Sequence, residues 1–331
     1  VTLPASLNYF GENTFYRCYE LGVGNLQVAE GNGHFMMKDN GKWLSNLGGD
    51  RLYWANFSKL GASVVIGEEI TYLHSGLFCD DNLLESITIN CDLEFLGVGT
   101  FYNTPELNSV ALNGSIEYIF GFTDVFNDDF YTWLTPLEKE QIMYYGAFES
   151  CVNLSEVLFV EGEELLTIGD KAFYRCTALK SIKLPERTLS LGENCFDGSG
   201  LSDIDFGGVR TIAANAFGNT KSLSVLTIPA SVTEIGKYAF RSSAISEIKF
   251  APRATGKEET PFEPLKLGES VFTYCASLKK ATFPDGLTSI PDSTFYNCAA
   301  LTYVYVPKTV ANGDDVVAGV SGFARAIGPR A

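Results

Sequence analysis

The sequence predicts a mostly β solenoid with short helical turns, and three observations support it. A phenylalanine recurs along the chain, most often 23 residues after the previous one, as from position 78 to 101 and from 272 to 295. A Leu or Ile follows each of them by five or six residues, and pairs of apolar residues spaced by two come next. Such a repeat is typical of arrays in which each unit buries its apolar face only against its neighbours. The register phenylalanines are Phe78, Phe101, Phe148, Phe173, Phe196, Phe217, Phe240, Phe272 and Phe295.

Each unit is predicted to contain one strand, a turn and a short apolar return. Ile182 and Leu184 are spaced by two, which is the period of residues on one face of a strand. Pro185 follows, and proline ends a strand because it has no N–H group to donate to the ladder. A second apolar segment, such as 232–235, leads to the next phenylalanine. Stacked units would place each register phenylalanine over the previous one.

Residues 30–57 interrupt this period and predict a small β-meander inserted between units. Asn40-Gly41 stands between two apolar segments, which is a strong hairpin signal. A second turn at 48–50 leads into the apolar segment 52–54. We expect the meander to be structural and to pack on the flank of the solenoid, with a binding role as the alternative.

Residues 120–145 form a second interruption, which is unusually rich in aromatic residues. A capping pattern with Pro136 at the first helical position predicts a helix at 136–144. Tyr131 and Trp133 are candidate binding residues, because exposed Tyr and Trp are favoured at interfaces. The alternative is that these rings only cover the edge of the solenoid.

The C-terminal segment has a different pattern. Apolar residues at helical spacing predict a helix at 315–327, stopped by Gly328-Pro329, which would cap the open end of the array. The predicted organisation is therefore a solenoid followed by a capping segment. The solenoid covers 1–310 with insertions at 30–57, 120–145 and 251–265, and the capping segment covers 311–331.

The charge balance excludes some classes of partner. The chain has 24 Lys and Arg against 40 Asp and Glu, a net charge of −16. Nucleic-acid binding needs a basic footprint, so no nucleic-acid partner is expected. No apolar run reaches the roughly 18 residues of a membrane span. The sequence starts at Val1 without a signal peptide, which suggests a mature form whose export signal was removed.

The eight cysteines predict free thiols in the core. Most of them stand three residues after a phenylalanine of the repeat, a position that recurs in a stacked column: Cys18, Cys151, Cys176, Cys275 and Cys298. Buried free Cys behaves as a small apolar residue. Disulfides between neighbouring units, Cys151 with Cys176 and Cys275 with Cys298, are the alternative. A zinc site is not expected, because there is no Cys-x-x-Cys pair.

No catalytic set is evident in the sequence. His34 and His74 are the only histidines, which makes a Ser-His-Asp triad improbable. No nucleotide-binding glycine pattern occurs, so we expect no cofactor. A carboxylate pair for glycoside hydrolysis stays open, because its spacing is spatial.

The remaining candidate surface is the outward face of the strands. Alternation places one row of side chains there, with Tyr303 and Tyr305 at its aromatic C-terminal end. A mixed, partly aromatic row suits a protein or peptide partner, and a simple solvated sheet face is the alternative. The row consists of Glu156, Ser181, Lys183, Asp203, Asp205, Val225, Thr227, Glu247, Lys249, Lys280, Thr282, Tyr303 and Tyr305.

The repeat motif resembles the BspA-type leucine-rich repeat. The pattern is clearest in 168–185, where Ile168-Gly169, Ala172-Phe173, Cys176, Leu179 and Leu184-Pro185 stand in order. The resemblance covers about residues 1–310 and implies a right-handed leucine-rich repeat solenoid of about 23-residue units.

The family consists of surface proteins of anaerobic bacteria and some parasitic protozoa. The resemblance therefore implies a non-enzymatic adhesion scaffold, at the cell surface or secreted, that binds a host matrix or bacterial surface protein. We also expect the protein to be a monomer. One alternative is a carbohydrate-binding protein that uses the aromatic residues of 120–145. Another is a structural spacer that holds a further module.

Overall fold

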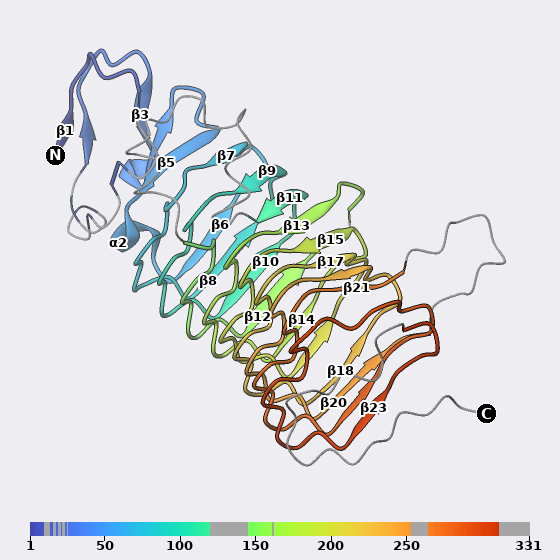
Figure 1. Cartoon of the computed structure of the whole chain (residues 1–331). Helices are drawn as coiled ribbons and strands as arrows, with labels where there is room; N and C mark the ends of the chain where they lie inside the picture. The colour runs from blue at the N-terminus through green and yellow to red at the C-terminus, as the bar shows by residue number, and fades with distance from the viewer. Residues whose placement is uncertain are drawn as a thin grey trace. The chain divides into compact units, whose positions relative to one another are not determined.

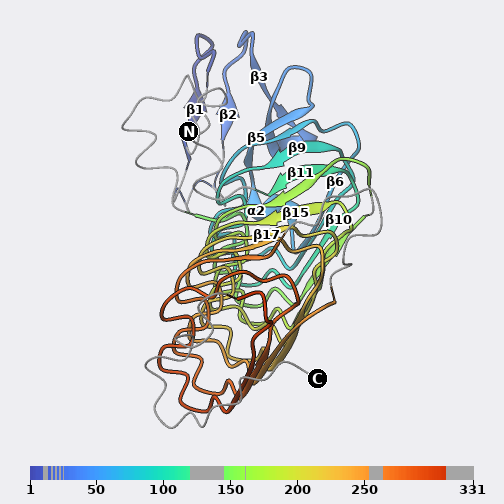
Figure 2. The ribbon, with the colours of Figure 1, turned by 45° about the vertical axis from the view of Figure 1, so that its right-hand side comes forward.

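The computed structural model describes residues 1–9, 14–15, 18, 21, 24, 26–119, 145–160, 162–252 and 264–310. The chain divides into two compact units, Val1–Leu179 and Lys180–Ala331. Each unit consists mainly of short β-strands joined by tight turns, stacked as the coils of a solenoid (Figures 1 and 2). The predicted β-solenoid is thereby confirmed. Its handedness and the boundary at residue 310 stay predictions.

The first unit contains two parallel sheets made by successive coils. One sheet has the order β12-β10-β8-β6, and the other contains β9, β11 and β13. The register advances without a slip, so Ile87 pairs with both Val64 and Val110, and Val110 pairs with Val157. These four apolar residues are buried. The strands are β6 Ser63–Ile66, β8 Ser86–Ile89, β9 Leu93–Leu96, β10 Ser109–Leu112, β11 Ile116–Ile119, β12 Glu156–Phe159 and β13 Leu166–Ile168.

The second unit repeats this arrangement. One face is built from the parallel sheet β18-β20-β22-β23 and from the pair β14-β16. The other side is built from β15, β17, β19 and β21, which pair in that order. Their bounds are β14 Ser181–Lys183, β15 Thr188–Leu191, β16 Asp203–Asp205, β17 Thr211–Ile212, β18 Val225–Ile228, β19 Glu234–Ile235, β20 Glu247–Phe250, β21 Lys266–Leu267, β22 Lys280–Thr282 and β23 Tyr303–Tyr305.

The register phenylalanines stack ring on ring, as predicted. Phe148 lies between Phe101 and Phe173, with ring centroids 5.1 and 5.2 Å away and planes within 4° of parallel. In the second unit, Phe217 and Phe240 stack at 5.3 Å. All of these rings are buried. Removing one such ring from a packed core costs about 3–5 kcal/mol, so the stack is a major source of stability.

The turns around the register phenylalanines differ from the predicted short helical turns. Residues two before and two after the ring have left-handed backbone angles, such as Lys171 (φ 54°) and Arg175 (φ 59°) around Phe173. This geometry directs the backbone N–H groups toward the next coil. The N–H of Ser150, two residues after Phe148, donates to the carbonyl of Tyr174 at 2.8 Å. Bonds between coils therefore alternate with bonds within a coil, such as that from the N–H of Cys151 to the carbonyl of Phe148 at 3.2 Å.

An antiparallel sheet lies near the N-terminus. Strands β3 Phe35–Lys38, β4 Trp43–Asn46 and β5 Arg51–Ala55 are antiparallel neighbours, and β7 Tyr72–Leu73 pairs with β5 in parallel. The chain turns through a 3-10 segment at Asp39–Gly41, in which all three residues have positive φ. That these strands are an insertion into the repeat stays a prediction.

The N-terminal sheet is followed by a single helical turn and preceded by two short strands. The helical turn is α2 Phe57–Leu60, and β1 Thr2–Leu3 pairs with β2 Gln27–Val28. The indole of Trp43 in β4 meets the ring of Phe78 edge-on, with centroids 6.0 Å apart. The sheet therefore packs directly on the first of the stacked rings.

All eight cysteines are free thiols, as predicted. Cys151 and Cys176 are fully buried and donate to the backbone carbonyls of Phe101 and Phe148, at 2.9 and 3.1 Å. Cys18 is an exception because it is exposed. Two predicted helices, 136–144 and 315–327, lie outside the described residues, and so does 253–263, the centre of the predicted 251–265 loop.

Candidate functional site

The outward side chains of β18, β20, β22 and β23 form one surface of the second unit, the outer face. These strands lie side by side (Figure 1). Leu226, Ile248, Ala281 and Val304 point inward and are buried. The residues between them point outward because side chains alternate along a strand. In register across the strands, the outward residues are Val225, Glu247, Lys280 and Tyr303 in one row, and Thr227, Lys249, Thr282 and Tyr305 in the next.

Polar contacts order the centre of the outer face. The carboxylate of Glu247 lies 3.1 Å from Lys280 Nζ and 3.4 Å from Lys249 Nζ. The hydrogen bond from Lys280 is the main reason that the pKa of Glu247 is below its ordinary value. Exposed ion pairs contribute little to stability, so their main effect here is to hold the side chains in place.

Tyr303 continues this chain of contacts. The ammonium group of Lys280 lies 5.6 Å from the centroid of its ring, within range of a cation–π interaction. The side chain of Tyr303 is 38% exposed, and that of Tyr305 is more buried. The structure thus brings Tyr303 and Tyr305 together at the predicted place. The other two candidates, Tyr131 and Trp133, lie outside the described residues.

The pair β14-β16 also presents charged residues outward. Ser181 pairs with Asp203, and Lys183 pairs with Asp205, so opposite charges face each other across two strands. A carboxylate oxygen of Asp205 also accepts the N–H of Gly207 at 3.2 Å. Within the second unit, the predicted row is therefore mixed in charge.

The corresponding sheet of the first unit is chemically different, and the sequence analysis missed this. Glu156, the first residue of the predicted row, lies opposite Ser109, and the strands before it present Ser86 and Ser63 at the same position. Val65 and Leu158 on this face are 66% and 53% exposed. The same alternation continues through 63–66, 86–89 and 109–112, so the signal was present in the sequence.

The outer face offers charges, hydroxyl groups and aromatic area, which are suited to binding. Among the described residues, no group of three or more His, Cys, Asp or Glu is arranged to hold a metal ion. The two histidines belong to the N-terminal region, where His74 is buried and its Nδ1 lies 3.2 Å from the hydroxyl of Tyr72. Within the part of the chain that the structure describes, no helix has the length and apolar character that crossing a membrane requires.

One of the similar solved structures has a TM-score above 0.5 and shares the fold. A leucine-rich repeat protein from Eubacterium ventriosum ATCC 27560 has a TM-score of 0.55 and 19% identity, over 79% of this chain and 60% of that one. A leucine-rich repeat protein from Bacteroides ovatus ATCC 8483 has a TM-score of 0.41 and 19% identity, over 83% of this chain and 75% of that one. A leucine rich cell surface protein from Faecalibacterium prausnitzii A2-165 has a TM-score of 0.30 and 19% identity, over 83% of this chain and 87% of that one.

The chain spans about 60% of the length of the Eubacterium ventriosum protein, and at this identity the similarity concerns the fold alone. No curated protein matches the chain significantly. The family model described as "BspA type Leucine rich repeat region (6 copies)" matches residues 54–129, 141–264 and 209–316. These matches cover well over half of the chain. The protein therefore belongs to the BspA-type leucine-rich repeat family.

Proposed function

We propose that this protein is a non-enzymatic interaction scaffold, at the cell surface or secreted, which binds a protein partner through the outer face. The observation that carries the proposal is the series of side-chain contacts that links Lys249, Glu247, Lys280 and Tyr303. It presents an exposed aromatic ring beside charges already held in position. Aromatic residues are enriched among the residues that dominate binding energy at interfaces.

Membership of the family supports the absence of catalysis and the surface location. Leucine-rich repeats typically serve as scaffolds, and a stacked array presents an extended binding surface. The BspA-type family resembled by the sequence consists of surface proteins. The partner that we propose is a host matrix protein or a bacterial surface protein.

The chemistry of the outer face favours a partner with a patterned surface. Lys249 and Lys280 flank Glu247, and an apolar neighbour, Val225, is 51% exposed. Complementary charges contribute to specificity and to the rate of association, while apolar and aromatic contacts contribute most of the affinity. We expect the protein to act as a monomer, because a net charge of −16 opposes self-association.

Biolayer interferometry would test the proposal. The full chain would be presented to purified extracellular-matrix proteins and to intact bacterial cells. Tyr303→Ala and Lys280→Glu should each weaken specific binding at least about tenfold, which corresponds to about 1.4 kcal/mol. Tyr274→Ala is the matched control, because Tyr274 is a 48% exposed tyrosine outside the outer face. Absence of specific binding by the folded protein, or equal binding by all variants, would refute the proposal.

A further inference from the structure

A second surface in the first unit is formed by aromatic residues on consecutive strands. Tyr53 of β5 lies 6.0 Å from Tyr72 of β7, and Tyr72 lies 5.9 Å from Phe95 of β9, measured between ring centroids. Tyr118 of β11 pairs with Phe95 in the sheet and is 40% exposed. Together, these four residues form the aromatic row. Tyr53, Tyr72 and Phe95 are partly buried, so each of them keeps some exposed surface.

Arg51 adds a charged group to the aromatic row. Its guanidinium carbon lies 4.3 Å from the centroid of the Tyr72 ring, and the two residues pair across β5 and β7. The Arg51 residue is exposed. Among the described residues, its side chain makes no ion pair or hydrogen bond. In a chain with 40 acidic and 24 basic residues, an exposed arginine that forms no ion pair is unexpected; its charge is the smallest of the causes that lower the pKa of Asp50.

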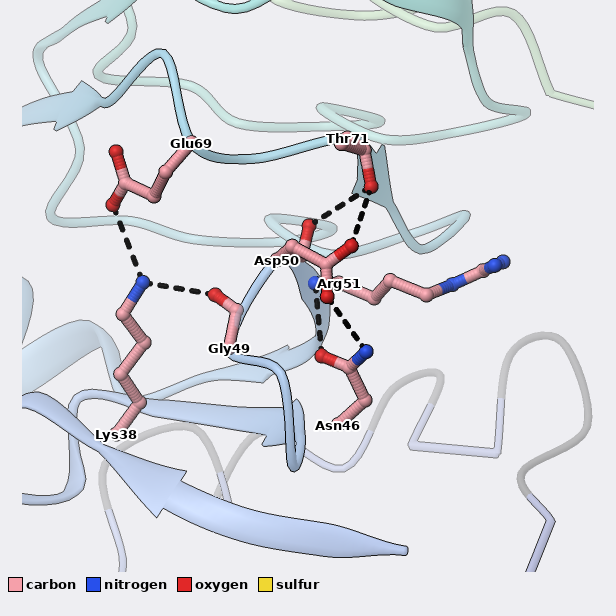
Figure 3. A network of polar contacts seen from close by, with 7 residues as sticks. All are labelled: Lys38, Asn46, Gly49, Asp50, Arg51, Glu69 and Thr71. Atoms are coloured by element: carbon pink, nitrogen blue, oxygen red, sulfur yellow. Dashed lines mark hydrogen bonds and ion pairs between the residues drawn. The ribbon is translucent and has the colours of Figure 1, made fainter.

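The carboxylate of the preceding residue, Asp50, is engaged in a different network (Figure 3). Its oxygens accept hydrogen bonds from Asn46 Nδ2 at 2.7 Å and from Thr71 Oγ1 at 3.0 Å. The hydrogen bond from Asn46 is the main reason that the pKa of Asp50 is below its ordinary value. Asn46 Oδ1 in turn accepts the backbone N–H of Arg51 at 3.1 Å. The network therefore holds the backbone at Arg51, while the side chain of Arg51 points away from it (Figure 3).

A further contact fixes the same turn. Lys38 Nζ donates to the carbonyl oxygen of Gly49 at 2.9 Å and forms an ion pair with Glu69 at 3.2 Å. The backbone N–H of Thr71 donates to the carbonyl oxygen of Asp50 at 2.8 Å. The turn before Arg51 is thus tied both to β3 and to the segment that precedes β7. A group held in place before binding loses less entropy when its ligand arrives.

This arrangement fits a particular ligand chemistry. A guanidinium group matches a carboxylate in two parallel hydrogen bonds, and its contact with an aromatic ring leaves those donors available. The electron-rich faces of aromatic rings suit the apolar C–H groups of a sugar ring. Glu94 and Glu117 stand one residue before Phe95 and Tyr118 on the paired strands β9 and β11, and neither is buried. Carboxylate oxygens at this border of the row could accept hydrogen bonds from sugar hydroxyls. A polyanion is disfavoured by the net charge of −16.

We propose that Arg51 and the aromatic row bind a sugar that carries a single carboxylate, with Arg51 on the carboxylate and the rings against the sugar. The shared chemistry is a pyranose carboxylate, which occurs in terminal sialic acids and in uronic acids. This site is distinct from the outer face, and it does not depend on the function proposed for that face.

Saturation-transfer NMR and isothermal titration calorimetry on the full chain would test this site. The probes are sialyllactose, glucuronic acid and, as the neutral control, lactose. We expect one or both acidic sugars to bind with a dissociation constant of roughly 1 mM, and lactose to bind at least about tenfold more weakly. Binding of sialyllactose would identify a sialic acid as the ligand, and binding of glucuronic acid would identify a uronic acid.

Variants would locate the binding. Arg51→Gln should lower the affinity at least about tenfold, and Arg51→Lys should retain only part of the binding, because it keeps the charge without the paired donors. Arg241→Gln is the matched control, since its guanidinium lies 6.0 Å from the ring of Tyr238 in the second unit. Circular dichroism and thermal melting would establish that each variant is folded.

Three results would overturn the proposal. One is that neither acidic sugar binds the folded chain when its concentration is several times the expected dissociation constant. Another is that lactose binds as well as sialyllactose, because the carboxylate would then not be recognised. The third is that Arg51→Gln and Arg51→Lys bind like the unmodified chain.

Discussion

The thiol of Cys151 lies 2.9 Å from the backbone carbonyl oxygen of Phe101, one coil earlier, and donates a hydrogen bond to it. The hydroxyl of Thr104, which stands at the same position of its own coil, makes the same contact with the carbonyl of Phe78 at 2.9 Å. In the second unit, Cys275 and Cys298 repeat it with Phe240 and Phe272, both at 3.0 Å. In these coils, the residue three positions after the ring supplies a buried donor to the neighbouring coil.

The first prediction concerns this donor. Valine and threonine have nearly the same shape, and both are larger than cysteine. Cys151→Val leaves the carbonyl of Phe101 with only the backbone N–H of Thr104 as a donor, so this variant should be less stable than Cys151→Thr by about 0.5–1.5 kcal/mol. Cys151→Thr should cost less, because threonine already makes this contact at position 104. Urea unfolding of both variants provides the measurement. Equal stability of the two variants would show that the donor contributes nothing.

The second prediction concerns thiol reactivity. Burial raises the pKa of Cys151 and of Cys298 to about 12, so these thiols are almost entirely protonated at pH 8. Cys18 is the exposed cysteine. Native protein treated with iodoacetamide at pH 8 should therefore be modified rapidly at Cys18 alone, and denatured protein at all eight cysteines. Mass spectrometry would detect the sites, and rapid native modification at a buried position would contradict the prediction.

The third prediction concerns pH. Asp81 is buried, and desolvation raises the pKa of its carboxyl from 3.8 to about 6, although it accepts hydrogen bonds from the N–H groups of Leu83 and Leu84. The folded state therefore binds this proton more tightly than the unfolded state. The contribution of Asp81 to stability is most favourable below about pH 4 and is lost as the pH rises through about 6.

Asp81→Asn isolates this effect, because an amide oxygen can accept the same hydrogen bonds without a charge. The rise in the pKa of Asp81 from 3.8 to about 6 corresponds to about 3 kcal/mol of free energy. The Asp81→Asn variant should therefore be more stable than the unmodified chain at pH 7 by up to that amount. The gain should vanish near pH 4. Unfolding by urea at both pH values would measure it, with the exposed Asp203→Asn as control. The same gain at both pH values would show that ionisation is not its cause.

The fourth prediction concerns the left-handed turns. Ser150 has a φ of 64° and donates its N–H to the carbonyl of Tyr174. A β-branched residue is strongly disfavoured in this conformation, so Ser150→Val should destabilise the protein by about 1–2 kcal/mol. Ser150→Gly should be close to neutral, since glycine adopts this conformation freely. Thermal melting would compare the two, and an equal effect of Val and Gly would argue against a backbone origin.

The repeat, the stacking of the phenylalanine rings and the alternation of buried and exposed strand residues could all be predicted from the amino-acid sequence. These depend on apolar residues at regular spacing, and spacing along the chain is visible before any fold is known. The position of Tyr303 beside Lys280 also follows from it, because parallel strands of equal register place equivalent residues side by side. The burial of Cys151, Cys176, Cys275 and Cys298 also follows from their place three residues after the ring, whereas the same prediction is wrong for Cys18, which is exposed.

The left-handed turns and the contact of Arg51 with Tyr72 could not be predicted from the sequence, because they depend on contacts between segments that meet only in the folded chain. Lys171, Arg175 and Tyr238 adopt left-handed angles although such residues rarely do, because the ladder between coils imposes the backbone geometry. Likewise, Arg51 meets Tyr72 because the turn at Asp50 is held by Asn46 and Thr71. No local pattern encodes that contact, since its partners come from separate strands and their distance is set only when the coils stack.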